Sequence, residues 1–166
     1  KRLKPIYGNI LLLDKTKWDI RNKNNKTYED IDIIIHLAAL VSVPESFKKR
    51  SEYIETNYEG TKNIIRAFPN SKIIFTSTAL AENPTCPYGK SKKMAEEFIT
   101  KSCKEFVILR LSNVGGGSHT NSESIQSSAI KAIKDKEFKI NGGDFKTKDG
   151  TAERDYIHVE DVIDSI

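Results

Sequence analysis

Short apolar runs alternate along the chain with segments in which apolar positions recur at helical spacing. Three of these runs, residues 32–40 (DIIIHLAAL), 72–78 (KIIFTST) and 105–111 (EFVILRL), are typical of strands buried on both faces of a parallel sheet. Two amphipathic segments, residues 51–68 and 88–103, separate the runs and predict helices. The order strand, helix, strand, helix, strand predicts a β-α-β-α-β unit.

The fold class that follows is α/β, a Rossmann-like, doubly wound parallel sheet. We expect right-handed crossovers to place helices on both faces of this sheet, and ligands to bind at the carboxyl ends of its strands. Gly60, inside the first helical segment, is expected to permit close packing. Residue 1 has no helix cap and the last segment has no C-terminal signal, so we expect the sequence to be truncated at both ends.

The pattern changes after residue 113. The expected elements are a Gly- and Ser-rich loop at 114–124, a helix at 125–133, short strands at 138–140 and 156–159, a turn at 148–150 and a helix from Glu160. We therefore divide the chain into residues 1–113, a partial Rossmann-like domain, and residues 114–166, the start of a small second region.

Composition narrows the function classes. The net charge of +4 (27 Lys and Arg against 23 Asp and Glu) is mild and the lysines are dispersed, which argues against nucleic acid as a partner. No apolar run approaches the roughly 18 to 20 residues of a membrane span, and the first residues do not form a signal peptide. Cys86 and Cys103 match no zinc or redox spacing, so we expect free thiols in a reducing cytoplasm. The scattered histidines indicate no metal site, and His36 and His158 are interpreted as structural.

Tyr88 and Lys92 are the candidate chemical pair. A Tyr and a Lys four residues apart share one face of a helix. A nearby ammonium favours the phenolate, so we expect Lys92 to lower the pKa of Tyr88 and to make it a general base. Residues 76–78 (TST) end the preceding strand, where hydroxyl groups would project toward a ligand.

These residues belong to an ordered set of motifs. The segments are His36–Ala39 (HLAA), Pro44–Ser46 (PES), Asn57–Thr61 (NYEGT), Pro87–Lys92 (PYGKSK), Leu109–Gly115 (LRLSNVG) and Lys148–Asp161 (KDGTAERDYIHVED). The set resembles the extended short-chain dehydrogenase/reductase family, and within it most closely the UDP-glucose 4-epimerases. The resemblance extends almost from end to end, and the last segment is its sharpest part.

The resemblance implies an NAD-binding domain in residues 1–113 and a substrate-binding region in residues 114–166. It implies that Tyr88 and Lys92 are catalytic, that Thr78, or Ser77 as a fallback, contacts the reacting sugar hydroxyl, and that NAD is the cofactor. The residues implied to lie near NAD are Asn9, Ile10, Leu37, Ala38, Ala39, Leu40, Val41, Thr56, Asn57, Tyr88, Lys92 and Ser112. Those implied to bind the UDP-sugar are Thr78, Asn113, Lys139, Ile140, Asn141 and Arg154.

The implied activity is epimerisation at C4 of a UDP-hexose through a 4-keto intermediate, in a cytoplasmic homodimer when full length. The alternatives are a nucleotide-sugar dehydratase or decarboxylase of the same family, and a non-catalytic NAD-binding relative. Dehydratases usually carry Asp-Glu after the strand-end threonine, where this chain has Ala79-Leu80. The short loop between Thr78 and Tyr88 favours the non-catalytic reading, whereas Tyr88, Lys92 and Arg154 oppose it. No glycine-rich pyrophosphate turn is present, so we expect the fragment alone to be inactive.

Overall fold

The apolar runs of the first part of the chain form a parallel sheet. The computed structural model describes residues 10–24, 26–116, 125–138 and 142–166, and the chain divides into two units, residues 1–111 and 112–166. The elements of the first unit are β1 (Ile33–His36), α1 (Val43–Lys48), α2 (Arg50–Ile54), the π-helix η1 (Glu55–Glu59), α3 (Gly60–Ala67), β2 (Lys72–Thr78), the 3-10 helix η2 (Ala79–Ala81), α4 (Pro87–Ser102) and β3 (Phe106–Leu111).

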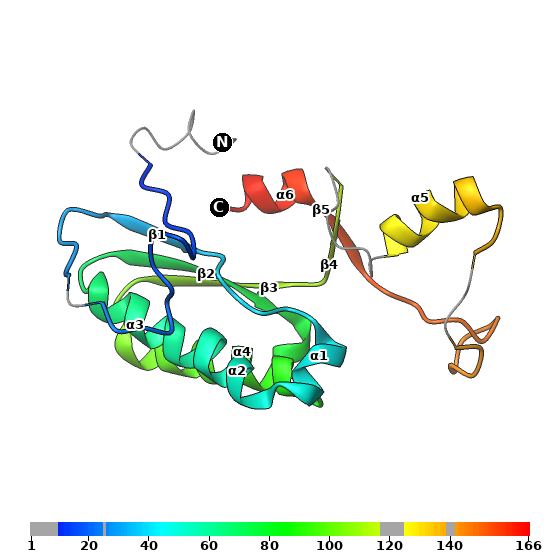
Figure 1. Cartoon of the computed structure of the whole chain (residues 1–166), viewed down its shortest axis with the longest axis horizontal. Helices are drawn as coiled ribbons and strands as arrows, with labels where there is room; N and C mark the ends of the chain where they lie inside the picture. Colours follow the sequence, from blue (N-terminus) through cyan, green and yellow to red (C-terminus); the bar gives the residue numbers. More distant parts are fainter. Residues whose placement is uncertain (1–9, 25, 117–124, 139–141) are drawn as a thin grey trace. The chain divides into compact units, whose positions relative to one another are not determined.

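The sheet has the order β1-β2-β3, with all described neighbours parallel. The predicted β-α-β-α-β unit is therefore confirmed. Helices α1 to α4 lie together on one face of the sheet (Figure 1), so the expectation that these crossovers would place helices on both faces was wrong. The strands are added in one direction, and two right-handed crossovers in the same direction fall on the same side.

The core of the first unit lies between the sheet and these helices. Ile73 and Phe75 of β2 pack against Ala95 and Ile99 of α4. A Cβ added to Gly60 would lie 2.7 Å from the Cδ1 atom of Ile20. The expected close packing at this glycine is therefore confirmed.

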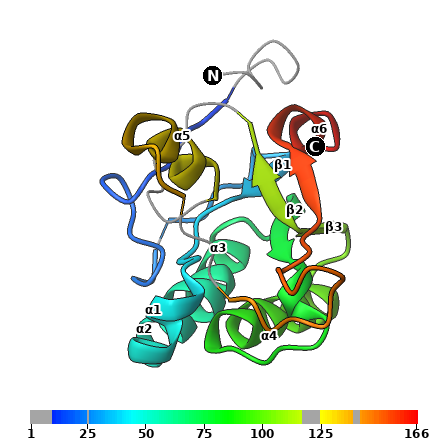
Figure 2. The same cartoon turned by 90° about the vertical axis from the view of Figure 1, so that its right-hand side faces the viewer.

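The second unit contains a small parallel pair of strands. Its elements are β4 (Asn113–Gly115), α5 (Ile125–Asp135), β5 (Tyr156–His158) and α6 (Val159–Asp164). Strands β4 and β5 pair with Asn113 opposite Tyr156, and they lie side by side in Figure 2. The predicted loop thus begins later than expected, because Val114 and Gly115 belong to a strand. Phe138 lies in no strand, and residues 139 and 140 lie outside the described residues.

The described residues offer neither a membrane-spanning helix nor a cluster of metal ligands. None of the helices there is long and apolar enough to cross a membrane. No group of three or more His, Cys, Asp or Glu side chains in the same part of the chain could hold a metal ion.

Candidate active site

The first two turns of α4 place Tyr88 and Lys92 on its inward face. Cys86 caps this helix, since its Sγ atom accepts a hydrogen bond from the amide of Gly89 at 3.3 Å. Pro87 follows at the first helical position, where its missing N–H costs no hydrogen bond. Both side chains are buried, with exposed fractions of 9% for Tyr88 and 2% for Lys92. The helical spacing therefore places both side chains on one inward face, as the sequence predicted.

Tyr88 lies in an aromatic pocket of its own unit. Its ring contacts the edge of the Tyr53 ring at a centroid distance of 6.3 Å, and Leu40 and Val43 pack against the same cluster. Burial raises the pKa of Tyr88, whereas the hydrogen bond to the Thr78 side chain acts to lower it. The predicted direction was therefore wrong: burial disfavours the phenolate more strongly than nearby groups stabilise it.

Lys92 is anchored to β2. Its Nζ atom donates a hydrogen bond to the carbonyl oxygen of Thr76 at 2.8 Å and lies 4.5 Å from the centroid of the Phe75 ring. Burial lowers the pKa of Lys92 to about 8, and the charge of Glu96 acts in the opposite direction. The side chain is therefore an ammonium that loses its proton far more easily than a surface lysine.

The three hydroxyl residues at the end of β2 have different partners. Thr76 donates to the carbonyl oxygen of His36 at 3.1 Å, and Ser77 donates to the Oε1 atom of Glu96 at 2.5 Å. The Thr78 hydroxyl accepts a hydrogen bond from the amide of Leu80 at 3.3 Å. Because the Ser77 proton is committed to a buried carboxylate, Thr78 is the stronger candidate for contact with a substrate.

The segment after β1 is the other part of this sheet edge. Leu37 and Val41 are each 60% exposed although they are apolar. Between them, Leu40 is held by Asn57, whose side chain accepts from the Leu40 amide at 2.8 Å and donates to its carbonyl at 2.9 Å. Asn57 also donates to the hydroxyl of Ser91 on α4 at 2.9 Å. The Asn57 side chain is thus occupied by the protein itself, and it fixes the backbone expected to line a cofactor.

Several further predicted residues stand in or near this unit. Thr56 is half-buried in η1, Ile10 is exposed, and Ala38 and Ala39 follow Leu37 in the same segment. The buried His36 bonds the hydroxyl of Thr61 at 2.9 Å, and burial, followed by the charge of Lys92, lowers its pKa to about 3. His36 is therefore a neutral packing residue. Asn9 and residues 139–141 lie outside the described residues.

The second unit contains the other predicted residues. The side-chain amide of Asn113 donates to the carbonyl oxygen of Asp155 at 3.1 Å. Arg154 is exposed, with its guanidinium 5.6 Å from the centroid of the Phe145 ring and a hydrogen bond to the carbonyl of Glu153 at 2.6 Å. Ser112 is half-buried. His158 caps α6 by accepting from the amide of Glu160 at 3.3 Å, which agrees with its structural interpretation.

Comparisons with known proteins identify the family of the chain. Residues 2–166 match the family described as the NAD dependent epimerase/dehydratase family. The chain belongs to this family. A UDP-glucose 4-epimerase of Lactobacillus helveticus is 34% identical to it over 170 residues, covering 82% of the chain and 51% of the relative. The chain thus spans about half the length of the curated relatives it matches.

Solved structures of epimerases have the same fold as this family member. One is the UDP-glucose 4-epimerase from Stenotrophomonas maltophila with bound NAD and formylated UDP-arabinopyranose, with a TM-score of 0.72 and 27% identity over 88% of the chain and 55% of the structure. Another is the UDP-glucose 4-epimerase from Bifidobacterium longum in complex with NAD+ and UDP, with a TM-score of 0.71 and 26% identity over 98% and 59%.

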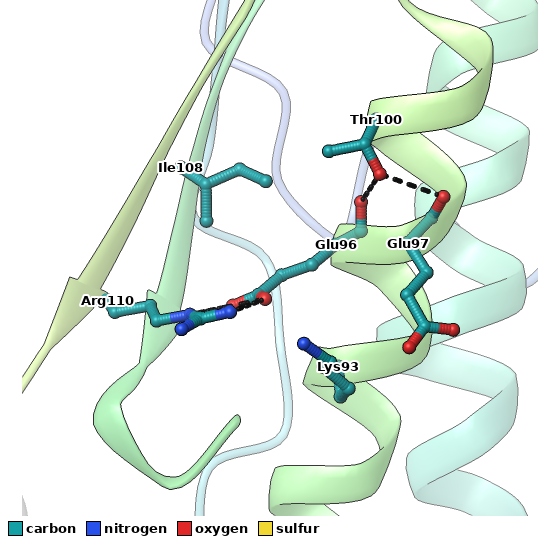
Figure 3. Close-up of a pocket in the computed structure, with 6 residues that line it drawn as sticks. All are labelled: Lys93, Glu96, Glu97, Thr100, Ile108 and Arg110. Carbon is teal, nitrogen blue, oxygen red and sulfur yellow. Dashed lines mark hydrogen bonds and ion pairs between the residues drawn. The ribbon is translucent and has the colours of Figure 1, made fainter. Parts of the chain in front are cut away.

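One charged cluster of this family member was not predicted from the sequence. A hollow of about 410 Å³ lies between α4 and β3, lined by Lys93, Glu96, Glu97, Thr100, Ile108 and Arg110. Glu96 and Arg110 form an ion pair in its lining, with 2.7 Å between Nη2 and Oε2 (Figure 3). The available signal was the position of Glu96, four residues after Lys92 and hence on the same helical face.

Proposed function

We propose that the protein carrying this chain catalyses the NAD-dependent epimerisation at C4 of a UDP-hexose, interconverting UDP-glucose and UDP-galactose. The observation that carries the proposal is the meeting of three groups at one sheet edge. Tyr88 and Lys92 on α4 face the end of β2, and the Thr78 side chain interacts with Tyr88 there. A phenol, an easily deprotonated amine and a hydroxyl beside the phenol are groups suited to proton transfer to and from a sugar alcohol.

NAD fits this edge of the sheet. The carboxyl ends of parallel strands are where dinucleotides bind in doubly wound folds, and the exposed apolar residues Leu37 and Val41 lie at such an end. We propose that residues 37–41 line the cofactor, together with Asn9, Ile10, Thr56 and Ser112, and that Lys92 binds its nicotinamide ribose. NAD supplies one piece of chemistry, the reversible acceptance of a hydride.

Side chains of the protein carry out the proton transfer. The deprotonated Tyr88 takes the proton of the C4 hydroxyl as C4 loses its hydride, which leaves a 4-keto sugar. Return of the hydride to the opposite face of C4, with the proton returned from Tyr88 to the oxygen, yields the epimer. Thr78 holds the reacting hydroxyl, and the cation of Lys92 favours the negatively charged form of Tyr88 that exists before the proton is taken.

The UDP group is assigned to the second unit. Among the described residues, the Arg154 guanidinium donates one hydrogen bond, to the Glu153 carbonyl, which leaves most of its five N–H donors for a ligand. A guanidinium suits a diphosphate because it can bind two oxygens at once. We propose that Arg154 binds the diphosphate, and that Asn113 and residues 139–141 contact the remainder of the UDP-sugar.

Two alternatives differ from this proposal in testable ways. A dehydratase needs further acidic groups beside the strand-end threonine, but here Ala79 and Leu80 form η2 at that place. In a non-catalytic relative, NAD would bind and no sugar would turn over. We further propose that the full-length protein is a cytoplasmic homodimer that acts in galactose metabolism.

Replacement of Tyr88 by Phe in the full-length protein tests the mechanism. We expect kcat for UDP-glucose to fall by roughly a hundredfold or more, because the proton acceptor is lost, while NAD binding changes little. A coupled assay for UDP-galactose and a fluorescence titration with NAD measure the two quantities. Tyr58→Phe is the matched control, because it removes a phenol from a different part of the same unit. A Tyr88→Phe protein with near-normal kcat would contradict the assignment.

A further inference from the structure

Glu96 is a buried carboxylate that the proposed proton transfer does not use. It lies on α4, four residues after Lys92 and eight after Tyr88, and its exposed fraction is 4%. A buried carboxylate is costly unless it is paired and hydrogen-bonded. Glu96 therefore needs partners that compensate for the burial of its charge on the inward face of α4.

The Glu96 carboxylate joins α4 to two strands. Ser77 of β2 donates to its Oε1 atom at 2.5 Å. Arg110 of β3 donates from Nε to Oε1 at 3.0 Å and from Nη2 to Oε2 at 2.7 Å. Ser77 and Arg110 are paired in the register of the sheet, so the Glu96 side chain is bonded to neighbouring residues of β2 and β3. Figure 3 shows its contact with Arg110.

This attachment lies close to the proposed chemistry. Ser77 directly precedes Thr78, and Tyr88 lies about 12 Å along the helix axis from Glu96 at 1.5 Å per residue. Glu96, Lys92 and Tyr88 lie in one continuous helix of 16 residues, whose regular hydrogen bonds fix their spacing. A rotation or slide at Glu96 therefore displaces Tyr88 and Lys92 relative to the end of β2.

We propose that Glu96 is a positioning residue for the epimerisation, an inference that rests on the proposed function. Its carboxylate sets the rotation of α4 against β2 and β3 and so aims Tyr88 and Lys92 at Thr78. It also occupies the Ser77 hydroxyl, which leaves Thr78 as the hydroxyl available to the substrate.

The charge of Glu96 has a second effect, on Lys92. Lys92 faces His36 from β1 and the ring of Phe75 from β2, and Glu96 is the anion that acts on it from its own helix. Glu96 in turn faces Arg110 from β3 and Lys93 from α4. A neutral residue at position 96 therefore makes the Lys92 ammonium less stable, and this change can be measured.

The test compares Glu96→Gln with Glu97→Gln in the full-length protein with NAD. Glu97 is an exposed carboxylate that lines the same hollow, so its replacement is the matched control. We expect Glu96→Gln to lower kcat for UDP-glucose by roughly tenfold to a hundredfold, as for a small misplacement of reacting groups, with KM within about twofold. We expect the pH dependence of kcat to shift to lower pH, and Glu97→Gln to behave as the wild type.

A double variant separates positioning from stability. Glu96→Met with Arg110→Met removes both charges and leaves no unpaired one behind, which proteins often tolerate. We expect this variant to unfold at a temperature near that of the wild type and still to show the lower kcat and the shifted pH profile. Recovery of wild-type kcat and pH dependence in the folded double variant would overturn the proposal. So would Glu96→Gln behaving as Glu97→Gln, or a failure of every Glu96 variant to fold.

Failure of the inference about Glu96 can be distinguished from failure of the proposed function. A wild-type protein that does not epimerise UDP-glucose refutes that function directly. The influence of Glu96 on the site is then decided by NMR titration of isotopically labelled Lys92. A lower Lys92 pKa in Glu96→Gln than in Glu97→Gln supports the inference, and equal pKa values contradict it.

Discussion

The buried surroundings of Lys92 disfavour the charged form of its side chain. Its ammonium is nearly fully buried and donates one hydrogen bond within the part of the chain that the structure describes, to the Thr76 carbonyl. The consequence is a pKa lowered from 10.5 to about 8, mainly by burial. Such a residue suits proton chemistry near neutral pH and reduces stability there.

Replacement of Lys92 by Met should therefore stabilise the protein at pH 7 while it removes activity. Below pH 8 the wild type must keep a buried ammonium that the unfolded chain holds in water. A shift from 10.5 to about 8, less one lost hydrogen bond, gives a gain in the free energy of unfolding of roughly 2 kcal/mol. Urea unfolding at pH 7 measures it.

The stability gained by Lys92→Met should decrease as the pH rises. Between pH 8 and 10.5 the unfolded lysine is protonated and the folded one is not, so the wild type becomes more stable as pH rises. The advantage of Lys92→Met should shrink steadily over that interval. Lys93→Met, the neighbouring position that faces the hollow, serves as control. A gain that stays constant with pH would show that burial of the charge is not its cause.

Among the elements, the sequence predicted regular strands and helices more accurately than irregular segments within them. The bounds of β2 agree with the predicted run of residues 72–78 at both ends, because the strand is mostly buried and its apolar residues stand out in the sequence. The helix predicted at 51–68 instead contains the π-helix η1. That irregularity coincides with Asn57, whose side chain holds Leu40, and no periodicity in the sequence reports such a contact.

The properties of the site residues also differ in how far the sequence could predict them. Helical spacing was enough to place Tyr88 and Lys92 on one face, since it depends on local geometry alone. The pKa direction of Tyr88 was missed because burial depends on residues distant in sequence, such as Tyr53. The three-residue strand β4 was missed because it is too short for a periodic signal.

Gly89 lies in the first turn of α4 and packs against η2, and its replacement by Ala should disturb the site. A Cβ there would lie 2.7 Å from the carbonyl oxygen of Leu80, a backbone atom that cannot rotate away. We expect a loss of about 1–3 kcal/mol in the free energy of unfolding and a fall in kcat, because Tyr88 is the adjacent residue. Thermal unfolding and the UDP-galactose assay measure the two effects.

Gly60 supplies the control for this prediction. Its added Cβ would also lie 2.7 Å from a neighbour, but that neighbour is the end of the Ile20 side chain, which can turn. Gly60→Ala should therefore change stability less than Gly89→Ala and should leave kcat unaffected. Equal losses of kcat in the two variants would indicate that contact with η2 is not what matters.

At the scale of the whole molecule, the sheet of the first unit is covered unevenly by the described elements. Helices α1 to α4 lie on one face (Figure 1). Ile33, Ile35, Val107 and Leu109 point to the other face by the alternation of the strands. Ile33 is 38% exposed, and the other three are half-buried. Parallel sheets are normally covered on both faces, so this surface favours further association.

We therefore predict that residues 1–166, produced alone, will self-associate and will not epimerise UDP-glucose. The chain spans about half the length of its relatives, and a partly exposed sheet face favours contact between copies. Light scattering coupled to size-exclusion chromatography gives the association state, and the coupled assay gives the activity. Ile33→Lys should reduce association, because it places a charge on the exposed face. Ile133→Lys removes an equally apolar side chain that is 80% exposed on α5 and should leave association unchanged. If Ile133→Lys alone yields a monomer, the sheet face is not the surface through which the chains meet.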